Sequence, residues 1–180
     1  VAQGMDILID LAESLKHRQD LGFLFVGRGS EVPRLRASVA ARSLTNTLFW
    51  SEIDPREIMG LLAQCHVGLL TLDPRHKTHN IPGKFLSYLL AGLPVLARVN
   101  AGTDLAHLID EEGVGRVYVG EAVDPLRRFA EELADPPAKR EAMTLRARAL
   151  AERMFSPTTA VRQIIATTSS YVDHDAWPRT

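Results

Sequence analysis

The chain has 180 residues, a formal net charge of -1, 46% hydrophobic residues and 24% charged residues. The near-neutral charge argues against a general nucleic-acid or membrane-surface binder, and no apolar stretch approaches the length of about 18 residues that a membrane-spanning helix needs. The length fits one α/β domain with its own core, and the single cysteine, Cys65, favours a reducing cytoplasmic compartment.

The first residues read as the beginning of a fragment. Val1 to Gly4 contain no initiator methionine and no signal-peptide pattern. We therefore expect a longer protein, with an N-terminal part that includes a strand before the first helix.

Apolar residues occur along the chain in two alternating patterns, one at helical spacing and one as short continuous runs. Helical spacing predicts amphipathic helices, and short apolar runs between turn residues predict buried strands. The predicted helices are 5–18, 32–39, 54–62, 82–91 and 105–109, and the predicted strands are 22–26, 47–50, 66–72, 94–97 and 115–119. From Asp124 onward the sequence predicts helices only, interrupted at 136–137 and at 156–157.

Strands that alternate with helices indicate a Rossmann-like α/β fold, a parallel sheet with helices on both faces. Such sheets bind ligands outside the carboxyl ends of their strands. The loops of interest therefore begin at Gly27, Trp50, Asp73 and Arg98.

The strongest local signal is the segment from Arg75 to Lys84. It contains three cationic side chains and two histidines, and it leads from a buried strand into a predicted helix N-terminus. The helix dipole, the exposed N–H groups and Lys84 would together form a diphosphate site. Most basic loops are simply solvated, but the position at a strand's carboxyl end favours a functional interpretation.

A second candidate loop is formed by Gly27, Arg28 and Gly29, between a strand and a helix. Glycines there would let a ligand approach the backbone, although a tight turn that needs positive φ explains them equally well. Asp54, before Pro55, and Asp104 are interpreted as N-terminal helix caps, and Gly92 as a left-handed C-terminal cap. Structural or surface roles are expected for Cys65, His66 and His107, and no zinc spacing, P-loop or G-x-S-x-G elbow is present.

Several motifs in one order resemble the retaining glycosyltransferase family 4. They are Gln3-Gly4-Met5-Asp6, Phe25-Val26-Gly27-Arg28-Gly29, Phe49-Trp50, Leu61-Leu62 and Pro82-Gly83-Lys84, followed by Tyr88 and Ala91-Gly92-Leu93-Pro94-Val95. The resemblance covers residues 3–120. The stretch 78–88 is similar to a narrower subgroup that is associated with N-acetyl-L-fucosamine transfer in bacterial surface polysaccharides.

The resemblance implies that residues 1–180 are the nucleotide-sugar-binding half of a two-domain GT-B enzyme, with C-terminal helices from about 124. The partners would be a nucleotide sugar, expected to be UDP-linked, and an N-terminal acceptor domain outside this chain. The resemblance implies no cofactor, no metal and no nucleic acid. The enzyme would be cytoplasmic, and only the absent half could bring it to the inner face of the membrane.

This sequence departs from the family pattern at three positions. The family usually has a lysine where Gln3 stands and two glutamates where His79 and Ser87 stand. Either Lys84 and His79 take over the missing functions, which we favour because Lys84 adds charge at the helix terminus, or the domain has lost donor binding.

The resemblance and the loops together assign roles to individual residues. Lys84 and His79 are the candidate catalytic residues, with Lys84 and the N–H groups near Pro82 and Gly83 stabilising the leaving diphosphate. The candidate donor-binding residues are Gly27, Arg28, Gly29, Trp50, Glu52, Asn80, Pro82, Gly83 and Ser87. Two alternatives stay open: a non-enzymatic nucleotide-binding or partner module, and a nucleotide-sugar 2-epimerase, for which no matching carboxylate motif is found.

Overall fold

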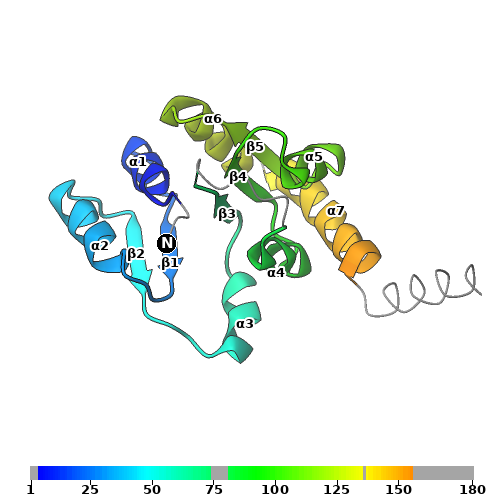
Figure 1. Cartoon of the computed structure of the whole chain (residues 1–180), viewed down its shortest axis with the longest axis horizontal. Coiled ribbons are helices and arrows are strands. Elements are labelled where there is room, and N and C mark those ends of the chain that lie inside the picture. The colour runs from blue at the N-terminus through cyan, green and yellow to red at the C-terminus, as the bar shows by residue number, and fades with distance from the viewer. Residues whose placement is uncertain (1–3, 74–80, 136, 156–180) are drawn as a thin grey trace, which may run out of the picture.

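The structure, a computed structural model, describes residues 4–73, 81–135 and 137–155 (Figure 1). The helices are α1 (Asp6–Ser14), α2 (Val32–Ala41), the 3-10 turn η1 (Pro55–Glu57), α3 (Ile58–Leu62), α4 (Gly83–Ala91), α5 (Asp104–Glu111), α6 (Val123–Ala134) and α7 (Pro137–Phe155). The strands are β1 (Phe23–Val26), β2 (Thr47–Trp50), β3 (Gly68–Thr71), β4 (Val95–Val99) and β5 (Gly115–Val119). The predicted alternation of strands and helices, ending in helices alone, is confirmed.

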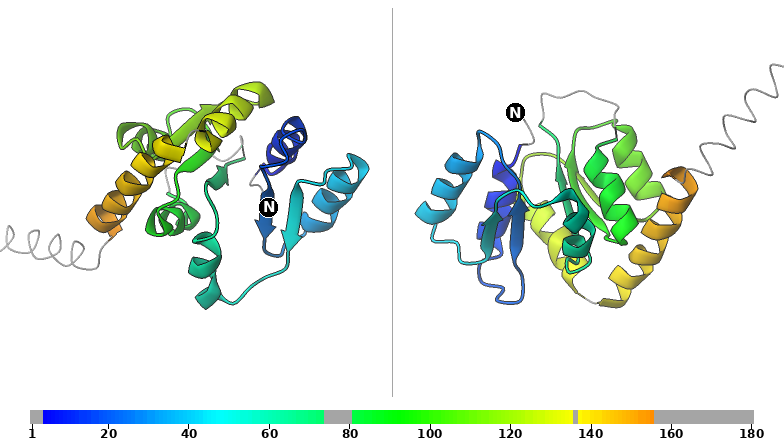
Figure 2. Two further views of the ribbon diagram at one scale, coloured as in Figure 1. Left: turned by 180° about the vertical axis from the view of Figure 1, so that it is seen from behind. Right: turned by 90° about the horizontal axis from the view of Figure 1, so that it is seen from below.

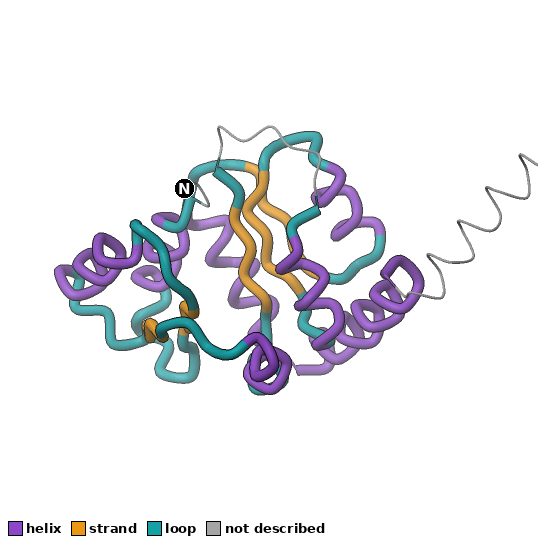
Figure 3. The backbone as a smooth tube through the Cα atoms, turned by 60° about the horizontal axis from the view of Figure 1, so that its bottom comes forward, coloured by secondary structure: helices purple, strands orange, loops and turns teal. Residues whose placement is uncertain are grey.

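All strand pairs are parallel, as predicted, but they form two sheets instead of one. β1 pairs with β2, and β3, β4 and β5 follow one another in a second sheet. No ladder joins β1 to β3 within the described residues, and the two groups of strands lie apart in the tube view (Figure 3). Side-chain packing and polar contacts, described next, connect them.

The hydrophobic core consists of two clusters that share β4. The first joins α1, β1 and α6 through residues such as Leu11, Phe25 and Leu126, and it includes Leu96 of β4. The second lies on the other face of β4, where Val95, Ala97 and Val99 pack with residues of α4, α5 and α7. β4 is therefore buried on both faces, which explains its continuous apolar sequence. Figure 2 shows helices on both sides of this sheet.

Within the described residues, the β1–β2 sheet is left open on one of its faces. Val26, Leu48 and Trp50 are 40%, 52% and 47% exposed. Successive strand residues point to opposite faces, so these three share one face. The described residues cover only the opposite face, where Phe25 stacks on Phe49 with the ring centroids 5.0 Å apart. An apolar stripe on the β1–β2 sheet is thus left open.

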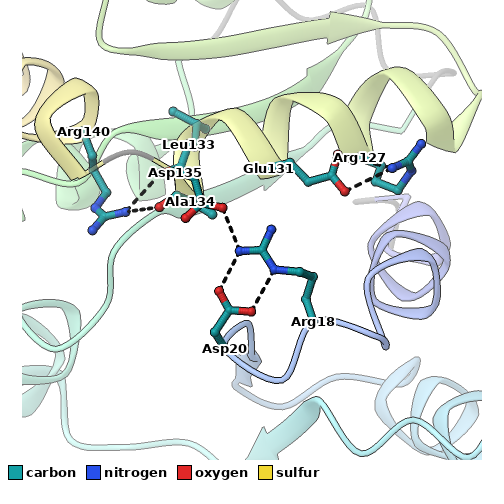
Figure 4. A network of polar contacts seen from close by, with 8 residues as sticks. All are labelled: Arg18, Asp20, Arg127, Glu131, Leu133, Ala134, Asp135 and Arg140. Atoms are coloured by element: carbon teal, nitrogen blue, oxygen red, sulfur yellow. Dashed lines mark hydrogen bonds and ion pairs between the residues drawn. The ribbon is translucent and has the colours of Figure 1, made fainter.

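Polar contacts join the β1–β2 half to the β3–β5 half (Figure 4). Arg18, between α1 and β1, donates to both carboxylate oxygens of Asp20 and reaches Asp135, at the end of α6, over 2.8 Å. A second arginine acts within the β3–β5 half. Arg140 of α7 donates to the carbonyl oxygens of Leu133 and Ala134, the last two residues of α6. These contacts satisfy carbonyl groups that a helix end leaves without a partner.

Two glycines fix α4 against β3 and end it. A Cβ atom on Gly68 would lie 2.4 Å from the ring of Tyr88, so only glycine lets α4 approach this strand so closely. The Tyr88 hydroxyl donates to the carbonyl oxygen of Leu69 over 3.1 Å. Gly92 ends α4 with φ 73°, and this confirms the left-handed cap predicted from the sequence.

N-terminal caps were predicted for two further helices, and one of the two predictions is correct. Asp54 caps the turn that starts with Pro55, as predicted, by accepting a hydrogen bond from the N–H of Arg56 over 2.9 Å. That segment is a 3-10 turn followed by the short α3 and not one continuous helix. At α5 the cap is Thr103, whose hydroxyl accepts from the N–H of Ala106, and Asp104 is the first helical residue.

Candidate functional site

The first part of the candidate site is the N-terminus of α4. Pro82 precedes the helix in an extended conformation and provides no side-chain cap. The N–H of Phe85 in the first turn donates to the carbonyl oxygen of Pro82 over 2.9 Å, and the helix dipole makes this end positive. A positive helix end of this kind is suited to an anion, and the role predicted for Pro82 and Gly83 stays a prediction.

Lys84 adds a formal charge to this helix end. The residue is exposed, yet the protein around its ammonium group removes enough water to lower the pKa of Lys84 from its ordinary value. A partly dehydrated ammonium gains more from a charged ligand than a fully hydrated one. Ser87, one turn further along, donates its hydroxyl to the carbonyl oxygen of Gly83 over 3.4 Å.

The second part of the candidate site gathers at the carboxyl ends of β1 and β2. The N–H of Gly27 donates to the carbonyl oxygen of Trp50 over 3.2 Å, and Arg28 pairs with Glu52 over 3.2 Å. Four residues predicted from two separate loops are thus neighbours. The Trp50 side chain is also accessible to a ligand, since it lies on the open face of this sheet.

The two glycines of this loop have different explanations. Gly27 has φ 137°, so the turn itself requires glycine and no ligand is needed to explain it. Gly29 does not have a positive φ, and a Cβ there would meet no described atom within 4 Å. Its lack of a side chain leaves space on the surface beside Arg28.

A third set of residues, at the carboxyl ends of β3 to β5, was missed as a group by the sequence analysis. Arg98 is only 5% exposed, and it donates to the carbonyl oxygens of Leu72 over 2.7 Å and of Gly120 over 2.8 Å. Asn100 donates to the carbonyl oxygen of Asp73 over 3.0 Å. The sequence feature that could have revealed this set is a charged residue, Arg98, inside the apolar run of β4.

The remaining predictions concern His79 and Asn80, a metal ion and the membrane. His79 and Asn80 lie outside the described residues. Within the ranges that are described, no group of three or more His, Cys, Asp or Glu residues is placed to hold a metal ion. In the same ranges, no helix has the length and apolar character needed to cross a membrane.

A small pocket lies away from all these residues. Its volume is about 180 Å³, and it is lined by Leu62, Ala63, Cys65, His66, Ala91, Gly92, Leu93, Arg140 and Thr144. His66 and Leu93 precede β3 and β4, so the pocket is at the amino ends of the strands. Parallel α/β sheets bind ligands at the opposite, carboxyl ends, and we therefore do not assign the donor to this pocket.

Comparison with known proteins gives one related sequence and several related folds. No family model matches the chain. It is 25% identical over 113 residues to the "Probable glycosyltransferase WbjE" of Pseudomonas aeruginosa, a match that covers 63% of this chain and 28% of that protein. The chain thus spans well under half of the length of this relative.

The structural matches extend over most of the chain. WaaG, a glycosyltransferase involved in lipopolysaccharide biosynthesis, matches with a TM-score of 0.65 and 23% identity, over 85% of this chain and 40% of WaaG. Anabaena HepE in complex with UDP and glucose matches with a TM-score of 0.74 and 20% identity, over 93% of this chain and 45% of HepE.

These matches define a class by its fold: the chain is a Rossmann-like α/β unit of the kind that forms part of GT-B glycosyltransferases. The sequence similarity is to WbjE, a probable glycosyltransferase. The expected fold is thereby confirmed.

Proposed function

We propose that this chain is the nucleotide-sugar-binding half of a glycosyltransferase. The observation that carries the proposal is the N-terminus of α4, with Lys84 beside it, in a fold similar to that of a UDP complex. A diphosphate is the ligand that a positive helix end and a partly dehydrated ammonium group are suited to bind.

The proposed reaction breaks the bond between a sugar and a nucleoside diphosphate. Negative charge develops on the leaving diphosphate, and the first-turn N–H groups of α4 together with Lys84 would stabilise it electrostatically. His79 and Asn80 would contact the sugar or the phosphates, and Ser87 the ribose. Trp50 and Glu52 would flank the base, and Arg28 would lie at the phosphate end.

The finer details of this function are proposals as well. They are a UDP-linked donor, retention of configuration, transfer of N-acetyl-L-fucosamine, and a surface-polysaccharide or lipopolysaccharide precursor as the acceptor. An N-terminal domain would bind the acceptor and complete the cleft, so we expect the present chain alone to bind nucleotide weakly and to transfer no sugar. The reaction would take place in the cytoplasm.

The test is UDP binding by isothermal titration calorimetry, with Lys84→Ala compared to the parent chain. Removing a charged hydrogen-bond donor should weaken binding by about tenfold to a hundredfold, which corresponds to about 1.5–3 kcal/mol. Lys16→Ala is the matched control, because Lys16 is an exposed lysine in the turn after α1. Equal affinities of Lys84→Ala and the parent would refute the diphosphate assignment.

Assays on the full-length protein distinguish a glycosyltransferase from a non-enzymatic partner module. Transfer of a sugar from a UDP-sugar, lost in Lys84→Ala, would support the glycosyltransferase. Failure of the full-length protein to bind UDP at all would favour a partner module without a donor site.

A further inference from the structure

Arg98 is a charged residue in a place where charge is costly. It belongs to β4, whose other residues are Val95, Leu96, Ala97 and Val99, and its side chain is 6% exposed. A buried charge must be compensated by nearby partners, or the fold loses stability. The contacts of Arg98 therefore show what this charge is used for.

The hydrogen-bond partners of Arg98 are main-chain carbonyl groups, and the Glu121 carboxylate lies at the limit of an ion pair. Leu72 and Gly120 each accept one hydrogen bond from the guanidinium group. Among the residues that the structure describes, its ion-pair partner is Glu121, with the two charged groups 4.0 Å apart and the Glu121 side chain 82% exposed. An exposed carboxylate at this distance is well screened by water, so Glu121 compensates little of the positive charge of Arg98.

This charge lies at the edge of the sheet where a ligand is expected. Leu72 directly follows β3 and Gly120 directly follows β5, so Arg98 joins the carboxyl ends of three neighbouring strands. Asn100 binds the carbonyl oxygen of Asp73 beside it. Arg98 and Asn100 thus hold the last two described residues before the segment 74–80, which leads to α4.

We propose that Arg98 is a positioning residue for the diphosphate of the ligand at this edge. It would hold the main chain at the start of the segment that leads to α4, and it would supply a fixed positive charge behind the phosphates. This inference rests on the proposed function. A guanidinium is suited to both tasks, since it stays protonated and offers several donors in one plane.

The charge and the anchoring can be separated by experiment. Arg98→Met removes both, Arg98→Lys keeps the charge, and Asn100→Ala removes an uncharged anchor of the same main-chain segment. The ligands are uridine, UMP and UDP, which share the base and ribose and differ in the number of phosphates. Affinities are measured by calorimetry on the 180-residue chain, after circular dichroism has shown that each variant is folded.

We expect Arg98→Met to weaken UDP binding by about tenfold or more, the loss usual for a charged contact, and to change uridine binding by less than about twofold. Arg98→Lys should retain most of the UDP affinity, and Asn100→Ala should change the three affinities by one common factor of less than about twofold, as expected for loss of anchoring alone. If Arg98→Met does not fold, Arg98→Lys and Arg98→Gln, compared with each other, give the same test of charge.

Two results would overturn the inference and leave the proposed function intact. One is an equal loss of uridine and UDP affinity in Arg98→Met, and the other is an Arg98→Lys variant that binds UDP as weakly as the neutral variant. A parent chain and a full-length protein that bind none of the three ligands would overturn the proposed function together with this inference.

Discussion

Among the described glycines, Gly115, the first residue of β5, leaves the least room for a Cβ atom, because Val95 of β4 lies beside it. A Cβ atom on Gly115 would lie 2.0 Å from the carbonyl oxygen of Val95 and 2.8 Å from its carbonyl carbon. Comfortable contacts between such atoms are about 3.5 Å, so Gly115→Ala must move β5 away from β4 by more than about 1 Å. Main chain cannot rotate away as a flexible side chain would.

The cost of this displacement has two parts. Overpacking of a buried site costs about 1–3 kcal/mol, and the hydrogen bond from the Val95 N–H to the Val114 carbonyl oxygen, now 3.0 Å long, would be broken at a further cost of about 1–3 kcal/mol. We therefore expect Gly115→Ala to lower the free energy of unfolding by about 3 kcal/mol. The measurement is urea denaturation followed by circular dichroism.

Gly60 provides the matched control. It lies in the short helix α3, and a Cβ there would meet no described atom within 4 Å. Because alanine is a better helix former than glycine, Gly60→Ala should leave stability unchanged or raise it by up to about 1 kcal/mol. A Gly115→Ala variant within about 0.5 kcal/mol of the parent would show that β4 and β5 are not packed as described.

Three further predictions follow from single side chains. Leu89→Ala should lower the free energy of unfolding by about 2–5 kcal/mol, since Leu89 is fully buried, whereas Leu90→Ala, at an exposed position, should change it by less than about 0.5 kcal/mol in the same urea assay. Hydrogen bonds from Arg18 lower the pKa of Asp20 to about 2. The contribution of this pair to stability is thus complete above about pH 5 and is lost as the pH falls towards 2, which an NMR titration of the Asp20 carboxyl group will check; a midpoint near 4 would contradict it. Saturating UDP should change the fluorescence of Trp50 in a variant whose other tryptophan is replaced by phenylalanine, and unchanged emission would exclude Trp50 from the site.

Strands were the most predictable elements, because buried parallel strands need continuous apolar sequence. The predicted range 47–50 agrees with β2 at both ends, and β1 begins one residue after its predicted start. The division into two sheets could not be predicted, since periodicity gives no information on which strands pair across long stretches of sequence. Helix ends were less predictable for a local reason: both Thr103 and Asp104 can cap α5, and the backbone conformation decides between them.

The candidate site was predictable where it depends on turns and helix ends. Gly27, Arg28, Trp50 and Glu52 were selected because their loops begin at the carboxyl ends of strands, and the structure places them side by side. Arg98 was recognised only as the start of a loop, because its position in the sequence does not show whether its side chain points to solvent or into the protein. Its burial and its carbonyl partners emerge only from the packing of three strands.

The two unjoined sheets have a practical consequence for work with this chain. β1 pairs on one side with β2, and β3 pairs on one side with β4, so within the described ranges each has a second edge of main-chain N–H and C=O groups outside any ladder. An accessible edge can serve as a template for strands of other molecules, and the exposed apolar stripe of Val26, Leu48 and Trp50 lies on the sheet that β1 borders, whereas β3 is largely buried. Aggregation that grows with concentration is therefore the expected hazard in purification and crystallisation, and any polypeptide segment that pairs with both edges would turn two small sheets into a single large one.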